Sequence, residues 1–339
     1  MGRTEPGDYA AGWTPPSYTV DENGKVRGGY EPHEPNNWGR WGDDDQIGTQ
    51  NLVGPEQIVA AARLVTEGKM FSLALDIDAS GPRFPTRPAP LHWFIMAGSD
   101  AIVGSPAQAE VSGYQWNDDM LQMPLQGSTQ WDGFGHFCAE DSMYNGYWAG
   151  DVTAAAGARN LGMEHMRKAF VGRCVLLDLA RAQGVDCLPD MAEIGRPELE
   201  ACVEAQGCEI HSGDIVLLRT GYLGKWWGIE GEAAKMEYFY ASPGLAESSV
   251  GWLHDNEISA AASDTIAVEV LQPKEEQSRI LPVHHSCLID LGLTLGEFWV
   301  LDELAEDCAA DGRYEFMLAS QPLVIPGAVG SPINPIALK

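Results

Sequence analysis

Hydrophobic and polar positions along the chain predict short strands and helices that alternate without a fixed spacing. Apolar residues from Ile58 to Val65 recur at helical spacing and predict a helix over 55–67, with Pro55 suited to its first turn. The branched apolar runs at 174–179 and 215–219 are typical of buried strands. Such an irregular alternation indicates an α/β protein rather than a TIM or Rossmann unit.

The remaining segments carry weaker patterns. Residues 1 to about 35 are rich in Pro, Gly and charge, so we expect an N-terminal arm over 1–37, lying on the surface or on a neighbouring subunit, followed by a single domain over 38–339. The other expected elements are a strand at 71–77, a loop at 78–92, a helix at 196–206, a helix at 248–256 with Ser249 as N-cap, a segment 258–263 leading into 264–269, a helix–turn–helix at 284–304, and a last strand at 316–325 before a Pro-rich tail.

Composition narrows the possible partners. The net charge of −28 would repel a phosphate backbone, so we expect no nucleic-acid partner. The seven Cys form no CxxC pair, and the sequence has neither an apolar signal segment nor eighteen consecutive apolar residues. We therefore expect reduced thiols, a cytoplasmic location and no membrane span.

The most informative stretch is 126–136, which reads Gln-Gly-Ser-Thr-Gln-Trp-Asp-Gly-Phe-Gly-His. Its offsets between Gln126, Gln130, Asp132 and His136 are all even, so an extended backbone would point the four side chains to one face. A row of amide, carboxylate and imidazole groups suits a divalent metal or a proton-transfer site.

This stretch resembles the metal-binding signature His-x-Gly-Thr-His-x-Asp-x-Pro-x-His of the cyclase family, which includes bacterial kynurenine formamidases and isatin hydrolases. Ser128-Thr129, Asp132 and His136 match it, whereas Gln126 and Gln130 stand where the family has histidines and Phe134 replaces the proline. Two further features occur in family order. They are a strand ending in Arg-Thr-Gly at 219–221, and a His followed twelve or thirteen residues later by Glu297, with His284 preferred over His285.

The resemblance implies the family's swivelling β/β/α fold, with a mixed sheet and flanking helices, assembled as a homodimer or homotetramer. It also implies a metal-dependent hydrolase of a cyclic or aryl amide, lactam or lactone. By resemblance the expected catalytic residues are Asp132, His136, His284 and Glu297, and the expected ligands of a Mn or Zn ion are Gln130, Asp132, His136 and His284. His136 or His284 would serve as general base.

Amide and aromatic side chains near these motifs are candidates for contacts with a small substrate, which we expect to be cyclic or aromatic. The selected residues are Gln126, Gln130, Trp131, Phe134, Tyr144 and Trp41, with Trp38, Trp116 and Tyr147 nearby. Trp131 alternates out of the polar row, so it can also face the core. Residues 143–146 are expected to form a loop closing over the pocket, and Arg219 is expected in a buried salt bridge rather than on a substrate carboxylate.

Two other functions stay open from the sequence. With Gln in two ligand positions the site can lack an ion, and Asp132 and His136 would then form an acid–base pair in an isomerase, lyase or cyclase. The third alternative is a non-catalytic small-molecule binding protein on the same scaffold, which would be stabilised by a ligand without forming a product.

Overall fold

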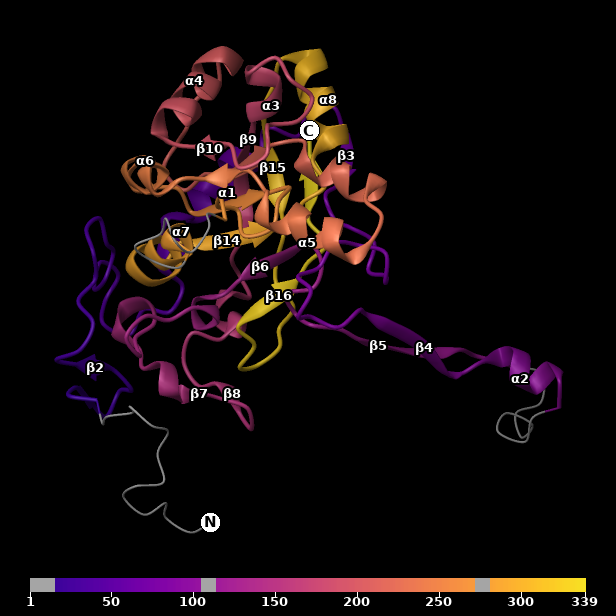
Figure 1. Ribbon diagram of the computed structural model, residues 1–339, viewed down its shortest axis with the longest axis horizontal. Coiled ribbons are helices and arrows are strands. Elements are labelled where there is room, and N and C mark those ends of the chain that lie inside the picture. Colours follow the sequence, from indigo (N-terminus) through magenta and orange to yellow (C-terminus); the bar gives the residue numbers. More distant parts are fainter. Residues whose placement is uncertain (1–15, 105–113, 272–280) are drawn as a thin grey trace, which may run out of the picture.

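The apolar runs at 174–179 and 215–219 lie in the middle of a nine-stranded sheet in the computed structural model, which describes residues 16–104, 114–271 and 281–339. Figure 1 shows this curled sheet with helices around it. From one edge to the other the strands are β16 (Gly330–Pro332), β6 (Gln130–Asp132), β14 (Thr294–Glu297), β13 (Ala260–Ser263), β11 (Ile215–Arg219), β9 (Val171–Asp178), β15 (Glu315–Ala319), β17 (Ile336–Leu338) and β3 (Met70–Ser72).

The sheet is mixed because its four central strands are parallel and its outer strands are antiparallel. β14, β13, β11 and β9 run in one direction, and β6, β16, β15, β17 and β3 pair antiparallel to their neighbours. Parallel strands are covered on both faces, which explains the unbroken apolar run from Val175 to Leu177, all fully buried. The expected α/β fold with a mixed sheet is therefore confirmed.

Helices surround the sheet, and α1 and α4 both pack against β9. The helices are α1 (Pro55–Ala62), α2 (Gly98–Ile102), α3 (Leu179–Ala182), α4 (Arg196–Gln206), α5 (Glu232–Tyr240), α6 (Val250–Asp255), α7 (Pro282–His284) and α8 (Asp302–Asp311). The short helix α7 continues into a π-helical segment, η9 (His285–Leu291). No helix among the residues described is long and apolar enough to cross a membrane.

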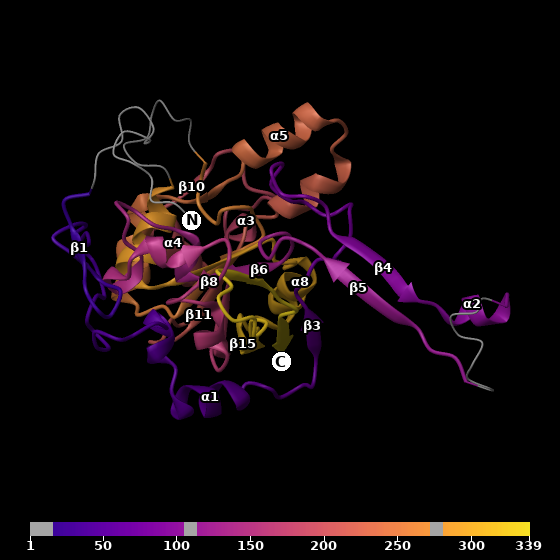
Figure 2. The same ribbon diagram turned by 90° about the horizontal axis from the view of Figure 1, so that it is seen from below.

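Smaller two-stranded sheets lie outside the main one. Figures 1 and 2 show the ribbon of β4 (Leu91–Met96) and β5 (Asp118–Gln122) projecting away from the body, with α2 at its far end. The other pairs are β1 (Thr19–Val20) with β2 (Val26–Arg27), β7 (Val152–Thr153) with β8 (Gly157–Ala158), and β10 (Glu193–Ile194) with β12 (Gly244–Leu245).

Several expected elements differ from the structure. The helix over 196–206 and the strand at 215–219 are confirmed, but the helix from Pro55 is shorter than expected and β3 spans three residues. Ser249 stands at the N-cap position of α6 as expected, but its hydroxyl makes no capping hydrogen bond and donates to the carbonyl of Ala246 instead. The segment 284–304 is not helix–turn–helix, since β14 lies within it, and the Pro-rich tail contains β16 and β17. Strands of three or four residues are too short to show a period in the sequence.

Residues 16–37 lie against the turn at 143–146 and against η9. The Lys25 ammonium donates to the carbonyl of Asn145 at 2.7 Å, and the backbone N–H of Asn37 donates to the carbonyl of Asp290 at 2.9 Å. Residues 1–15 of the expected arm lie outside the described residues.

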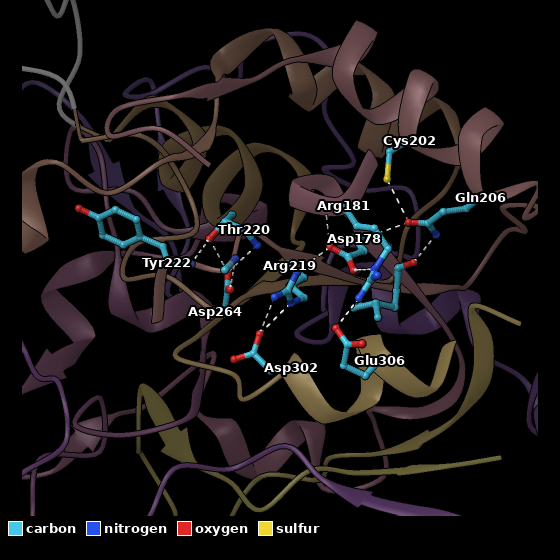
Figure 3. A network of polar contacts seen from close by, with 12 residues as sticks. Asp178, Arg181, Cys202, Gln206, Arg219, Thr220, Tyr222, Asp264, Asp302 and Glu306 are labelled. Carbon is cyan, nitrogen blue, oxygen red and sulfur yellow. Dashed lines mark hydrogen bonds and ion pairs between the residues drawn. The ribbon is translucent and has the colours of Figure 1, made fainter. Parts of the chain in front are cut away.

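A network of polar contacts holds the carboxyl end of β11 (Figure 3). Arg219 forms ion pairs with Asp178 at 2.9 Å and Asp302 at 2.8 Å, so its expected structural salt bridge is confirmed. Beyond it, the carboxylate of Asp264 accepts hydrogen bonds from the backbone and hydroxyl of Thr220 and from the backbone of Gly221. The Arg-Thr-Gly motif thus fixes the end of β11 to the segment that follows β13.

Candidate metal centre

Strand pairing brings the first polar residues of the site together. In the antiparallel pair of β6 and β14, Gln130 lies directly opposite Glu297, and Asp132 lies two residues further along β6 on the same face. The Gln130 amide nitrogen donates to Asp132 Oδ1 at 3.1 Å and to Glu297 Oε2 at 3.0 Å. The register therefore places two buried carboxylates side by side, bridged by an amide.

His284 enters this cluster from α7. Its Nε2 lies 3.9 Å from Asp132 Oδ2 and 3.9 Å from Glu297 Oε1. On the other side of the ring, Nδ1 lies 2.6 Å from Glu269 Oε1, and Glu269 also accepts hydrogen bonds from the backbone N–H groups of Val283 and His284. The Glu269 carboxylate holds a proton on Nδ1, so Nε2, which faces the cluster, is the nitrogen that would give up its proton and offer a lone pair to an ion.

His136 completes the cluster from a short 3₁₀ turn, Phe134–His136. Its Nε2 lies 4.0 Å from Asp132 Oδ1. The His136 side chain is 26% exposed and the nearby Arg87 side chain 24%, against 0% to 6% for Asp132, His284 and Glu297. A substrate would therefore reach the cluster from the side of His136 and Arg87.

Burial and mutual charge set the protonation of the site. Burial raises the pKa of Asp132, and burial together with the charge of Asp132 raises the pKa of Glu297. Burial and the neighbouring His284 lower the pKa of His136 to about 4, so this ring is neutral near pH 7. Burial also lowers the pKa of His284, but the hydrogen bond and charge of Glu269 outweigh it and raise that pKa to about 9.

The residues present fit a divalent cation. One ligand atom from each of Asp132, His284 and Glu297 lies within 4.8 Å of the other two, and all three residues are buried. Asp132 Oδ2 and Gln130 Oε1 are buried and have no hydrogen-bond partner among the described residues. Carboxylate, imidazole and amide donors together suit Mn, Zn or Fe. An ion there would satisfy the unpartnered oxygens and offset the excess of buried negative charge.

The structure also shows how the expected one-faced row is made. Only Gln130–Asp132 forms a strand, while Gln126 lies in a turn before it and His136 in the 3₁₀ turn after it. The Gln126 carbonyl accepts a hydrogen bond from Arg87 at 2.5 Å, and Arg87 lies 4.0 Å from Glu297. The backbone over 126–136 is therefore not extended throughout, although the structure brings Gln130, Asp132 and His136 together.

Several residues selected for substrate contact lie elsewhere. Trp131 points away from Gln130 and Asp132 into the core, where its ring stacks on Phe170 and its indole N–H donates to the carbonyl of Ser320. Phe134 is fully buried against Tyr144, whose hydroxyl donates to Asp45. Aromatic side chains here are needed for packing, and sequence position alone did not separate that need from substrate contact.

Trp41 also lies away from the cluster. Trp41 stacks with Arg40, and Arg40 is paired with Glu257, which lies just before the amino end of β13. Glu297 lies at the carboxyl end of the neighbouring parallel strand β14, so it is at the opposite end of these strands. The segment 143–146 is a buried turn rather than a loop over the pocket, since the Asn145 amide donates to the carbonyls of Gly42 and Asp45.

The other tryptophans and tyrosines near the motifs have separate places too. The Trp38 indole donates to the carbonyl of Ile289, Tyr147 packs under the ammonium of Lys25, and Trp116 lies 42% exposed before β5. None of these contacts involves Asp132, His284 or Glu297.

The structure adds site residues that the sequence did not reveal. Glu269 supports His284, Arg87 lies at the mouth, and the ring of Phe137 lies 6.0 Å from that of His284. Arg87 falls in a Pro-rich loop and Glu269 lies fifteen residues before His284, so no local spacing connected them to the motif. Of the two candidate histidines, His284 faces the cluster, and His285 points to Asp290 instead.

Comparison with known proteins identifies the family. Residues 71–270 match the model of the family described as Putative cyclase, which is more than half of the chain. The chain therefore belongs to this cyclase family, as its motifs predicted. No match was found among curated proteins.

Solved structures agree with this assignment. The crystal structure of a novel cyclase is 44% identical, covers 90% of this chain and 99% of its own, and superposes with a TM-score of 0.83. Isatin hydrolase A from Labrenzia aggregata, bound to benzyl benzoate, is 18% identical, with 83% and 97% of the chains covered and a TM-score of 0.57. An isatin hydrolase bound to the product analogue thioisatinate is 17% identical, with 85% and 99% covered and a TM-score of 0.55. At these identities the isatin hydrolases share the fold.

Proposed function

We propose that this protein is a metal-dependent hydrolase of a cyclic or aryl amide, lactam or lactone. The observation that carries the proposal is the buried group of Asp132, His284 and Glu297, in which Asp132 Oδ2 has no hydrogen-bond partner among the described residues. The similarity in fold to isatin hydrolases supports the choice of a ring-opening hydrolysis.

Asp132, His284, Glu297 and the Gln130 amide oxygen would hold the ion. When bound, the ion supplies Lewis-acid polarisation of a carbonyl and acidification of a water. His136 is neutral near pH 7 and partly exposed, so it takes a proton from the attacking water and returns it to the leaving nitrogen or oxygen. Arg87, held by the Gln126 carbonyl, is placed to orient the substrate carbonyl or its product carboxylate.

The test compares wild type with Asp132→Ala, and with Glu303→Ala as control, because Glu303 is an exposed acid on α8, away from the projecting ribbon. Each protein is purified without added metal, analysed by elemental mass spectrometry, and assayed with isatin, N-formylkynurenine and a lactone panel. We expect Asp132→Ala to lose about one Mn or Zn per chain and all hydrolysis. Equal metal content in wild type and Asp132→Ala would refute the proposal.

A metal-independent acid–base reaction is the second candidate, and the position of Gln130 favours it. Its amide nitrogen already donates to both carboxylates, which lowers their need for a cation. Asp132 and His136, 4.0 Å apart, would then exchange protons with the substrate. Turnover that persists after exhaustive chelation would support this candidate over the first.

We also infer that a second copy of the chain covers the projecting ribbon. The strands β4 and β5 expose large apolar side chains on both faces, and isolated monomers rarely keep such patches in water. The exposed residues include Leu91, Phe94, Ile95, Met120 and Leu121. A dimer or tetramer, as the resemblance implies, would bury them. Light scattering should show a smaller particle for Phe94→Ser/Ile95→Ser than for wild type, and an unchanged mass would count against this interface.

A further inference from the structure

A second cluster of potential metal ligands lies on the far side of the helix that carries His284. His33, His285 and Asp290 each offer one ligand atom within 4.8 Å of the other two. His285 follows His284 directly but points the opposite way, towards the N-terminal segment. The cluster therefore shares no side chain with the site proposed above.

The carboxylate of Asp290 is the central feature of this cluster. Its side chain is fully buried, and Oδ1 accepts hydrogen bonds from the Tyr30 hydroxyl at 2.6 Å and from the His33 backbone at 3.2 Å. Oδ2 is buried and has no hydrogen-bond partner among the described residues. A buried carboxylate oxygen without a partner is costly unless a cation or proton satisfies it.

Two imidazole nitrogens face that oxygen at a distance that suits an ion. His33 Nδ1 lies 3.6 Å and His285 Nδ1 3.5 Å from Asp290 Oδ2, which is longer than a hydrogen bond. Two ligands of a tetrahedral zinc ion, with bonds of about 2.0–2.1 Å, lie about 3.4 Å apart. The Tyr30 hydroxyl, 2.7 Å from His33 Nδ1 and 3.2 Å from His285 Nε2, adds an oxygen at the edge of the cluster.

We propose that His33, His285 and Asp290 form a second, structural metal site that takes a divalent transition ion such as Zn²⁺. Imidazole and carboxylate ligands are a zinc-type set. The ion enters past His33, whose side chain is 52% exposed, while His285 and Asp290 are nearly or fully buried. It fastens the segment around residues 30–33 to η9, and thereby to the helix that positions His284.

The test uses metal-stripped full-length protein loaded with Zn²⁺ and desalted, with zinc per chain measured by elemental mass spectrometry. The variants are His33→Ala, Asp132→Ala and the double variant. His211→Ala is the control, since His211 lies outside the ribbon and forms an exposed pair with Glu209 at 3.3 Å. Circular dichroism verifies the fold, and His33 is exposed enough for its loss to be tolerated.

We expect His33→Ala to bind about one zinc fewer per chain than wild type, while His211→Ala matches wild type. Zinc should raise the melting temperature of Asp132→Ala but not of the double variant. Equal zinc content in wild type and His33→Ala, or loss of all zinc in Asp132→Ala alone, would overturn the second site. Loss of zinc from His33→Ala, with no loss from Asp132→Ala, would support the second site. That result would instead contradict the metal centre of the proposed function.

Discussion

Replacing Glu269 by Gln tests how the protein orients and charges His284. Glu269 is buried and accepts three hydrogen bonds, from the Val283 and His284 backbones at 2.9 Å each and from the His284 ring at 2.6 Å. Gln keeps the shape but loses the charge, and its amide NH₂ must face at least one of these N–H donors. The variant therefore weakens bonds to a charged acceptor, which are worth about 1.5–3 kcal/mol each.

The magnitude follows from the pKa of His284. Its pKa of about 9 in the fold compares with about 6.5 in an unfolded chain, and each pH unit corresponds to about 1.4 kcal/mol, so the upper limit is about 3 kcal/mol. Because the folded pKa is raised, this stability is fully present below about pH 6.5 and is lost as the pH rises through about 9. The charges of Asp132 and Glu297 also raise the pKa of His284, so we assign only about 2 kcal/mol of this limit to Glu269.

The assay is thermal unfolding of chelator-treated wild type and Glu269→Gln at pH 6 and pH 9. A 339-residue chain has an unfolding entropy of about 0.7 kcal/mol/K, so about 2 kcal/mol lowers the melting temperature by about 3 °C at pH 6. The difference should shrink at pH 9. Glu303→Gln, an exposed acid on α8, is the charge-matched control. A Glu269→Gln difference that is absent at pH 6, or equally large at both pH values, would refute the reasoning.

Three further predictions test other parts of the structure. His136→Ala should lower turnover about 10²–10⁴-fold while leaving the melting temperature within about 1 °C, and turnover at the wild-type rate would exclude His136 as the base. Trp131→Ala should cost about 3–5 kcal/mol, or about 4–7 °C in melting temperature, without lowering metal content, because Trp131 packs in the core. Burial by itself would raise the pKa of the Asp311 carboxyl group. The hydrogen bond from Lys339 acts in the opposite direction and helps lower that pKa to about 2. Lys339→Met should therefore lower stability by about 1 kcal/mol above pH 4, and urea titrations should show the difference vanishing as the pH falls to about 2.

The sequence alone determined the class of fold and the chemical type of the site. The short, branched apolar runs at 174–179 and 215–219 predict buried strands, because a strand covered on both faces is apolar throughout. The motif at 126–136 predicted that Gln130, Asp132 and His136 belong together, and the resemblance to the family's His–Glu pair added His284 and Glu297. Residue type and local spacing carry this information, because ligand chemistry depends on side-chain identity.

Tertiary structure decided the contacts that join distant segments. Glu269 and Arg87 reach the cluster from segments whose local sequence contains no motif, and the direction of each side chain at His284 and His285 depends on how α7 packs. Trp131 is a further example. It lies between Gln130 and Asp132 on β6, so its side chain points to the opposite face of the strand, which is packed in the core. Spacing along a chain specifies which residues share a face, but only the packing of the strands and helices specifies what that face meets.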